Sequence, residues 1–364
     1  MTQPEEDLSE RKGTKIFLNG PSASSRRMGR FFRSAGGLLV SLVITFLGLL
    51  AITFIIGRLI PLDPVLSIVG ERASEAAYNK VREELGLNLP IWHQFAIYCW
   101  NVIRGDFGMS IITARPVTAD IARVFPATAE LATLGIIIGI LLGIPSGVWA
   151  AVYRNSVVDQ VIRVIGLIGY SMPVFWLGIM GLLLFYSKLN WIAGPGRLDV
   201  FLEGMVPRVT GMILFDAAWN HNWDVFRNAF SHIVLPAALL GLYSLAYISR
   251  MTRSLMLEQL NKEYITTARV KGVSERRIVW RHAFGNILIP LITVVVLAFA
   301  SLLEGSVLTE TVFSWPGLGR YLTGALLAAD MNAVLGGTIV VGSIFVGVNL
   351  LSDVLYKIVD PRAR

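Results

Sequence analysis

The chain has 364 residues, of which 54% are hydrophobic and only 16% are charged, and its mean hydropathy is +0.62. Soluble globular domains carry about 25% charged residues, so the composition excludes that class and indicates a membrane protein. The formal net charge is +7. Basic loops of membrane proteins usually record orientation, so we expect no nucleic-acid partner. With Cys99 as the only cysteine and four scattered histidines, the chain offers no intrachain disulfide and no metal site.

The N-terminal part divides into three segments. Residues 1–36 are polar and mixed in charge, which predicts a disordered tail. Residues 37–60 form an apolar run that is too long, and begins too late, for a secretory signal peptide, so we expect an uncleaved first span. Residues 61–126 are more polar and nearly balanced in charge, and residues 79–87 are amphipathic. They predict a partly helical segment on the outer face of the membrane.

Six apolar stretches reach the length of about 20 residues that a membrane-spanning helix needs, and none shows the alternation of a membrane β-barrel. The fold class is therefore an all-α polytopic membrane protein. The expected spans are residues 37–60, 127–151, 158–189, 231–250, 287–308 and 333–356. The third span contains Ser171 and Pro173. Proline removes a backbone donor and kinks a helix, and broken spans face a cavity or protein rather than lipid.

The basic residues indicate which loops face the cytoplasm. They concentrate in the tail, after the second span, after the fourth span and at the C-terminus. With six spans, these four segments fall on the same side, which the positive-inside rule makes cytoplasmic. Both termini are thus predicted to be cytoplasmic, and the segment 61–126 to lie on the opposite, outer side.

The largest predicted cytoplasmic loop, residues 251–286, contains a compact basic segment at 263–282. Gly272 suits the residue after a helix, because glycine takes a left-handed conformation at no steric cost. Ser274 suits a helix N-cap, and Glu275 complements the positive end of the following helix. The segment therefore predicts a helix, a sharp turn and a second helix leading into the fifth span. The alternative from spacing alone is a basic loop that only sets topology.

This segment resembles the cytoplasmic EAA-type loop of binding-protein-dependent ABC importer permeases, in particular the dipeptide and oligopeptide permease family. The matching runs are Tyr264, Thr267-Ala268-Arg269-Val270-Lys271-Gly272, Ser274-Glu275-Arg276-Arg277, Trp280-Arg281-His282-Ala283 and Asn286-Ile287-Leu288-Ile289-Pro290. Thr266 and Thr267 stand where the generic loop has Glu and Ala, a departure that fits the peptide subfamily.

Further motifs extend the resemblance in order over about residues 33–364. They are Arg58-Leu59-Ile60-Pro61-Leu62-Asp63-Pro64, Arg104-Gly105-Asp106-Phe107-Gly108, Pro126-Ala127-Thr128-Ala129-Glu130-Leu131, Ser171-Met172-Pro173-Val174-Phe175-Trp176, Glu310-Thr311-Val312-Phe313-Ser314-Trp315-Pro316-Gly317-Leu318-Gly319-Arg320 and Asp360-Pro361-Arg362. The resemblance implies a type I importer permease in the bacterial inner membrane, with a core at residues 127–364.

The resemblance also implies the partners. The chain lacks a phosphate-binding G-x-x-x-x-G-K-[ST] loop, so ATP and Mg would sit on two separate ATPase subunits, with no cofactor on this chain. A second permease, a periplasmic binding protein and membrane lipid complete the expected partners. The residues expected to couple to the ATPases are Glu263, Tyr264, Thr267, Ala268, Arg269, Lys271, Gly272, Ser274, Glu275, Arg276 and Arg277.

Two other sets of residues are singled out by the same motifs. Ser171, Pro173, Phe175 and Trp176 are candidates for the translocation path, with ordinary packing as the alternative. Glu310, Trp315, Pro316, Gly317 and Gly319 are assigned to a periplasmic loop facing the binding protein, in which the glycines shape a turn. Peptides are the leading cargo, and nickel chelates, glutathione, opines and oligosaccharides are alternatives. The rival classes are an ATP-independent channel or secondary transporter, and a membrane scaffold or sensor.

Overall fold

The computed structural model describes residue 40 and residues 42–57, 64–70, 73–84 and 86–359. These residues form helices and connecting loops, and the isolated bridge between Met109 and Pro116 is the single β-type pairing among them. The all-α fold class is confirmed. The predicted tail, the ends of the first predicted span and the motifs at 58–63 and 360–362 lie outside the described residues.

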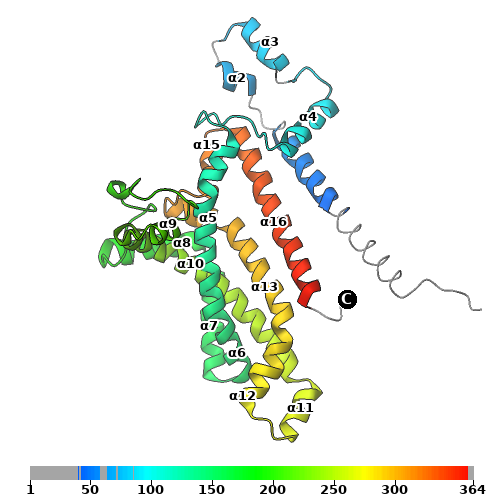
Figure 1. Cartoon of the computed structure of the whole chain (residues 1–364), viewed down its shortest axis with the longest axis vertical. Coiled ribbons are helices and arrows are strands. Elements are labelled where there is room, and N and C mark those ends of the chain that lie inside the picture. Colours follow the sequence, from blue (N-terminus) through cyan, green and yellow to red (C-terminus); the bar gives the residue numbers. More distant parts are fainter. Residues whose placement is uncertain (1–39, 41, 58–63, 71–72, 85, 360–364) are drawn as a thin grey trace, which may run out of the picture. The chain divides into compact units, whose positions relative to one another are not determined.

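Four continuous helical stretches in the described part of the chain are long and apolar enough to cross a membrane, and one bent pair of helices adds a fifth. A shorter apolar helix, Leu42–Gly57, occupies the described part of the first predicted span. The long stretches are α5 (Val117–Ile138) with η1 (Gly139–Gly143) and α6 (Ile144–Val152), α10 (Trp223–Leu260), α12 (Glu275–Arg277) with η4 (Ile278–Ala283) and α13 (Phe284–Gly305), and α16 (Met331–Val359). These stretches, drawn in Figure 1, are longer than the predicted apolar cores, although α13 ends at Gly305 and the predicted fifth span runs to residue 308.

The bent pair corresponds to the third predicted span. Helix α7 (Val157–Ser171) ends at Met172, whose backbone is extended, and α8 (Val174–Gly181) with η2 (Leu182–Lys188) begins after Pro173. The two halves are bent by 98°. The predicted break at the proline is therefore confirmed, and it is a full change of direction.

The connecting segments contain shorter helices. They are α2 (Pro64–Val69), α3 (Glu75–Glu84), α4 (Ile91–Ile103), η3 (Val200–Leu202), α9 (Ile213–Trp219), α11 (Glu263–Val270), α14 (Val307–Val312) and α15 (Leu318–Leu327). The amphipathic stretch predicted at residues 79–87 lies partly in α3, and the chain turns at Gly86 with a φ of +67°.

Helix α10 is the central element of the core and packs against α5, η1, α6, α7 and α13. Glycines one turn apart let the first long stretch approach it closely. A Cβ at Gly147 would lie 2.6 Å from the carbonyl oxygen of Ser249, and one at Gly135 would lie 2.9 Å from Leu240 Cβ. Ser244 Oγ also donates a hydrogen bond of 2.8 Å to the Gly135 carbonyl. Small residues and such interhelical hydrogen bonds are the usual means of packing helices in a membrane.

Candidate functional site

The basic segment at residues 263–282, which we call the elbow, forms the predicted helix, turn and helix. Helix α11 is closed by a Schellman arrangement: the Gly272 amide donates to the Arg269 carbonyl at 2.9 Å, and the Val273 amide donates to the Ala268 carbonyl at 3.1 Å. Gly272 has a φ of +74°. This left-handed conformation is the reason for a glycine after the helix, so the predicted conformation of Gly272 at the end of the helix is confirmed.

The second arm of the elbow begins at Ser274, which has the extended backbone of an N-cap residue. Its hydroxyl makes no capping hydrogen bond, so only the backbone part of the predicted cap is present. The Glu275 carboxylate instead accepts a hydrogen bond of 2.8 Å from Arg269 Nε across the turn. This hydrogen bond raises the pKa of Arg269. The pair joins the two arms of the elbow on its exposed side.

Apolar side chains fix the inner side of the elbow. Ile265 of α11 and Ile278 and Val279 of η4 are buried in the main hydrophobic cluster, which also contains Met256 of α10. Burying an aliphatic side chain of this size stabilises the fold by about 1.5–3 kcal/mol. The elbow is therefore held in place by the core and cannot act as a loose linker.

Tyr264 connects three helices at the base of the elbow. Its hydroxyl donates to Gln259 Oε1 of α10 at 3.0 Å and accepts from Asn286 Nδ2 of α13 at 3.0 Å. Both Tyr264 and Asn286 belong to the motif that the sequence singled out, and the structure brings them together although 22 positions separate them. The tyrosine thus fixes the angle between the helices that enter and leave the elbow.

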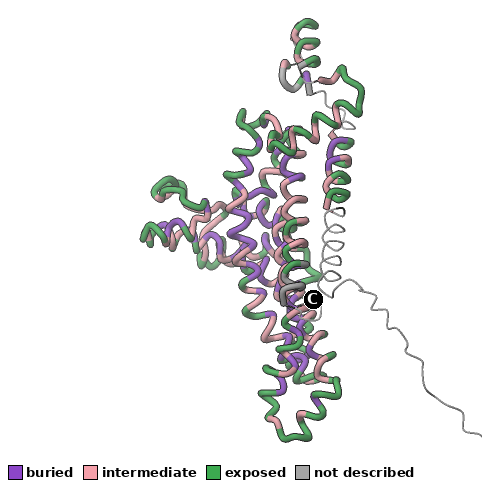
Figure 2. Tube along the Cα trace, turned by 45° about the vertical axis from the view of Figure 1, so that its right-hand side comes forward, coloured by how far each residue is buried: buried purple, intermediate pink, exposed green. Residues whose placement is uncertain are grey.

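The outer side of the elbow is exposed, as the lower end of the chain in Figure 2 shows. Val270, at the tip of α11, is 84% exposed. Most of the other exposed positions carry charges or hydroxyl groups, and the exceptions are Gly272 and Trp280: the charged and hydroxyl-bearing residues are Glu263, Tyr264, Thr266, Thr267, Arg269, Lys271, Ser274, Glu275, Arg276, Arg277 and Arg281. The basic groups outnumber the acidic ones on this side, so the exposed surface of the elbow suits an acidic surface of a protein partner.

The second arm is continuous with the fifth predicted span. The π-helical segment η4 contains Trp280, Arg281 and His282 and leads without a break into α13. Trp280 packs edge-on against Phe284 with ring centroids 5.4 Å apart. Such π segments inside helices are frequent at functional sites. Residues 275–305 form one continuous helical stretch, so no flexible linker separates the second arm of the elbow from α13.

The four residues proposed for the translocation path lie at the break between α7 and α8. Ser171 and Pro173 are exposed, and Phe175 and Trp176 are each 44% exposed. The opposite side of α8 is packed, because a Cβ at Gly178 would lie 3.2 Å from both Phe313 and Val312. The break therefore presents aromatic rings outward while its inner side rests on the loop that follows α14.

That loop, residues 310–320, is organised around the buried carboxylate of Glu310. Its Oε1 accepts hydrogen bonds from Thr128 Oγ1 at 2.6 Å and Ser306 Oγ at 3.0 Å, and its Oε2 accepts one from the Arg320 amide at 3.0 Å. Burial raises the pKa of Glu310 above its usual value, although these hydrogen bonds oppose the shift. The Thr128 hydroxyl also accepts a hydrogen bond of 2.7 Å from the Leu318 amide.

The two glycines of the loop make room for this arrangement. A Cβ at Gly319 would lie 2.6 Å from Val307 Cα, and a Cβ at Gly317 would overlap the Glu310 carboxyl group. Gly317 has a φ of −99°, which any residue adopts, so close approach is what requires a glycine there. The turn that these glycines shape wraps around the Glu310 carboxyl group.

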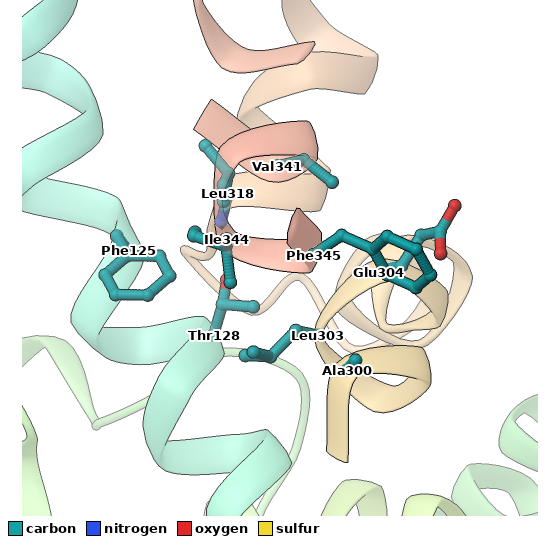
Figure 3. Close-up of a pocket in the computed structure, with 9 residues that line it drawn as sticks. All are labelled: Phe125, Thr128, Ala300, Leu303, Glu304, Leu318, Val341, Ile344 and Phe345. Atoms are coloured by element: carbon teal, nitrogen blue, oxygen red, sulfur yellow. Dashed lines mark hydrogen bonds between the residues drawn. The ribbon is translucent and has the colours of Figure 1, made fainter. Parts of the chain in front are cut away.

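Trp315 is the third buried part of the loop. Its side chain is fully buried, and its indole Nε1 donates a hydrogen bond of 2.9 Å to the Ala127 carbonyl. Thr128 and Leu318, which are hydrogen-bonded to each other, also line a cavity of about 10 Å³, shown in Figure 3, which is about the volume needed for one water. Glu310 and Trp315 therefore hold the loop together, while Thr311, Pro316 and Arg320 are its exposed residues.

The sequence reasoning missed a buried ion pair that ties α7 to α10. Asp159 is fully buried, and its carboxylate accepts hydrogen bonds from Arg253 Nε at 2.8 Å and Arg253 NH2 at 2.9 Å. The Asn155 amide donates to the same carboxylate at 3.0 Å. The sequence signal for this pair is Asp159 itself, a carboxylate within an apolar run. Its partner Arg253 lies 94 positions away, so the sequence alone does not identify the pair.

The segment between α8 and α10 contains a second group that the sequence reasoning missed. Arg197 pairs with Glu130 of α5, and the Leu214 amide donates to the same carboxylate at 2.7 Å. The Asp216 carboxylate accepts hydrogen bonds from backbone amides, including Thr210 at 2.8 Å. Burial raises the pKa of Asp216, but the hydrogen bonds outweigh it and the net shift is downward. Arg197 and Leu214 thus hold the segment against Glu130 of α5, and Asp216 fixes the turn within the segment.

Comparison with known proteins places this architecture in a family. Residues 139–364 match the family model of the binding-protein-dependent transport system inner membrane component, and residues 30–132 match its N-terminal companion model. The chain belongs to this family of transport permeases. With its apolar helices, it is a multi-pass inner-membrane protein.

Two relatives from Escherichia coli (strain K12) are similar over most of their length. The chain is 45% identical over 321 residues to the protein named "Probable D,D-dipeptide transport system permease protein DdpB", covering 88% of this chain and 94% of the relative. It is 43% identical over 324 residues to the "Dipeptide transport system permease protein DppB", covering 88% and 95%. An inward-facing structure of the MetNI methionine ABC transporter matches with a TM-score of 0.45 and 17% identity, over 64% of this chain and 93% of that chain.

Proposed function

We propose that the chain is the permease subunit of an ATP-driven importer of dipeptides or oligopeptides, and that the elbow couples it to separate ATPase subunits. The observation that carries the proposal is the elbow itself: a rigid turn with an exposed apolar tip, continuous with a membrane-spanning helix. The family match supports the transporter class, and the dipeptide permeases among the relatives support the cargo.

In this mechanism, α11 docks on an ATPase subunit through the tip at Val270 and the basic residues around it. Closure of two ATPases on ATP and Mg moves the elbow. Because η4 and α13 form one helical stretch with the second arm, the movement is passed to the membrane core, which alternates between inward-open and outward-open states as rocking bundles do. This chain contributes no ATP site, so hydrolysis belongs to the partners.

The remaining partners follow from the same class of transporter. A second, related permease forms the other half of the translocation path, and a periplasmic binding protein delivers the cargo. The N- and C-termini lie in the cytoplasm on this proposal. Since Glu310 and Trp315 are buried, the binding protein would contact the exposed Pro316 and Arg320 instead.

Phe175 and Trp176 support a path beside the break between α7 and α8, because both rings are exposed there. Aromatic rings and a polar hydroxyl such as that of Ser171 suit varied peptide side chains. Nickel chelates, glutathione, opines and oligosaccharides remain the alternative cargoes. A binding protein that co-purifies with the complex would name the cargo through its bound ligand.

The docking proposal is tested by cysteine crosslinking in the complex purified from native membranes. Val270→Cys and Leu327→Cys are matched, because both side chains are 84% exposed but Leu327 lies on α15, away from the elbow. In a Cys99→Ser background, Val270→Cys should crosslink to an ATPase subunit and Leu327→Cys should not. ATP hydrolysis should rise when the loaded binding protein is added. The absence of any ATPase, even under crosslinking, would favour the channel or scaffold classes.

A further inference from the structure

A groove between α7 and α10 belongs to neither the elbow nor the loop around Glu310. Its volume is about 560 Å³, which is within the range of small-molecule sites, about 300–1,000 Å³. Arg250 and Arg253 lie about 10–15 Å before the end of α10 that leads into the elbow, at a rise of about 1.5 Å per residue. The residues that carry the argument are Ile162, Arg163, Tyr170, Arg250, Arg253 and Leu257.

The charges of the groove are not balanced. Asp159 is the carboxylate beside it, and this group is already occupied by the two hydrogen bonds from Arg253. Arg163 Nε lies 3.4 Å from the same carboxylate and is 54% exposed. Arg250 pairs with no carboxylate among the described residues, and its guanidinium lies 5.2 Å from the centre of the Tyr170 ring. Arg163 and Arg253 thus share one buried carboxylate and Arg250 has none, so the groove keeps a net positive charge.

The surroundings of the groove are apolar. Along α7, Val161, Val164, Leu167 and Ile168 are all exposed, with Leu167 at 65%. Within the groove, Ile162 and Leu257 form apolar walls. A ligand that fits both features carries a negative charge at one end and hydrocarbon next to it.

We propose that the groove binds the headgroup of an anionic phospholipid, with the phosphate between Arg163 and Arg250 and the acyl chains along the exposed side of α7. Arginine suits this role because its planar guanidinium forms paired hydrogen bonds to phosphate oxygens. Basic pockets between membrane-spanning helices on the cytoplasmic side are typical sites for such headgroups. The lipid neutralises Arg250, which otherwise lies as an unpaired cation in a membrane-spanning helix.

The same charges disfavour a peptide as the occupant. A peptide carboxylate would match Arg250, but the peptide ammonium would find no free acidic group, since Asp159 is fully buried and occupied. An anion without a cationic end avoids this mismatch. The proposal concerns this chain and membrane lipid, and it does not depend on which cargo the complex carries.

The test measures phosphatidylglycerol bound to the complex after purification in mild detergent, by native mass spectrometry during titration with that lipid. Arg163→Gln and Arg250→Gln should each weaken retention about five-fold, and the double variant about 25-fold, which is the usual effect of single basic residues near anionic lipid. Arg154→Gln is the matched control. Arg154 is exposed in the turn before α7 and does not line the groove, so its loss should leave retention unchanged.

Three further experiments distinguish the possible occupants of the groove. Excess inorganic phosphate should leave the lipid bound, because phosphate lacks the acyl chains; displacement by phosphate would overturn the proposal. Displacement of the lipid by a dipeptide would assign the groove to the cargo. Crosslinking of Leu167→Cys to the partner permease in high yield would show that protein covers it. Equal retention by the double variant and the wild type, with both complexes monodisperse and equally heat-stable, would also refute the lipid site.

Discussion

Replacing Gly272 tests whether the geometry of the elbow, and not only its charge, is needed for coupling. Gly272 has a φ of +74°, and a Cβ built there meets no atom within 4 Å. A side chain would therefore cause no clash, and the cost comes from the backbone alone, about 1–2 kcal/mol for an ordinary residue in this conformation. A β-branched residue is a stronger outlier there, while asparagine tolerates the conformation best after glycine. A cost of this size changes the population of the native turn by a factor of about 5–30.

We therefore expect Gly272→Val to lower the amount of peptide transported per ATP several-fold, and Gly272→Asn to stay close to wild type. The assay compares transport and ATP hydrolysis of the whole complex in proteoliposomes. Gly285→Ala is the control, because Gly285 also has open space around it but lies inside a helix. Unchanged coupling in Gly272→Val would refute the reasoning. An equal loss in the asparagine and valine variants would show that the side chain, rather than the backbone, matters.

Three further changes test other parts of the chain. Gly319→Ala should destabilise the protein by about 1–3 kcal/mol, because the added methyl group meets the Val307 backbone. Gly324→Ala on the same helix meets nothing within 4 Å and should stabilise the protein by about 0.4–1 kcal/mol. Thermal unfolding of both variants in detergent measures the difference in stability. Asp159→Ala should cost about 3–5 kcal/mol by leaving Arg253 unpaired, seen as loss of monodisperse protein, and a yield equal to wild type would contradict this. Glu275→Gln breaks only an exposed ion pair, worth about 0–1 kcal/mol, so transport should change little; a large loss would mean that this carboxylate contacts a partner.

The elbow was predictable because its signals are local. Gly272 after one helix and Ser274 before the next define the turn within a few residues, and the structure has both backbone conformations as expected. The break at Pro173 is also local, since the proline itself removes the donor. The angle of 98° between the two halves was not predictable, because it depends on what packs against α8.

The turn around the Glu310 carboxyl group could not be predicted from local sequence signals as the elbow was. Its motif was visible, and its glycines predicted a turn. However, the Thr128 hydroxyl that bonds the carboxylate lies 182 positions away. The assignment of Glu310 and Trp315 to a loop facing a binding protein did not anticipate that both side chains are buried. A motif locates a segment, but the direction of each side chain depends on helices elsewhere in the chain.

The glycines of the first long helical stretch are an intermediate case. Gly135, Gly139, Gly143 and Gly147 recur one turn apart in the sequence, which predicts a close helix contact. The sequence does not name the partner, and the structure shows that it is α10.

These contacts limit where the chain can bend when the elbow moves. At one end, the elbow is held to α10 by Ile265 and is continuous with α13. At the other end, Thr128 and Glu310 join α5 to α14. The glycine contacts hold α5, η1 and α6 against α10 along their length. The break at Met172, where the backbone leaves the helix, is the place among these helices where a hinge costs no helical hydrogen bond. We therefore expect α8 and its exposed aromatic rings to reorient relative to α7 when the transporter changes state, and distance measurements between labels on the two halves, with and without ATP, would detect it.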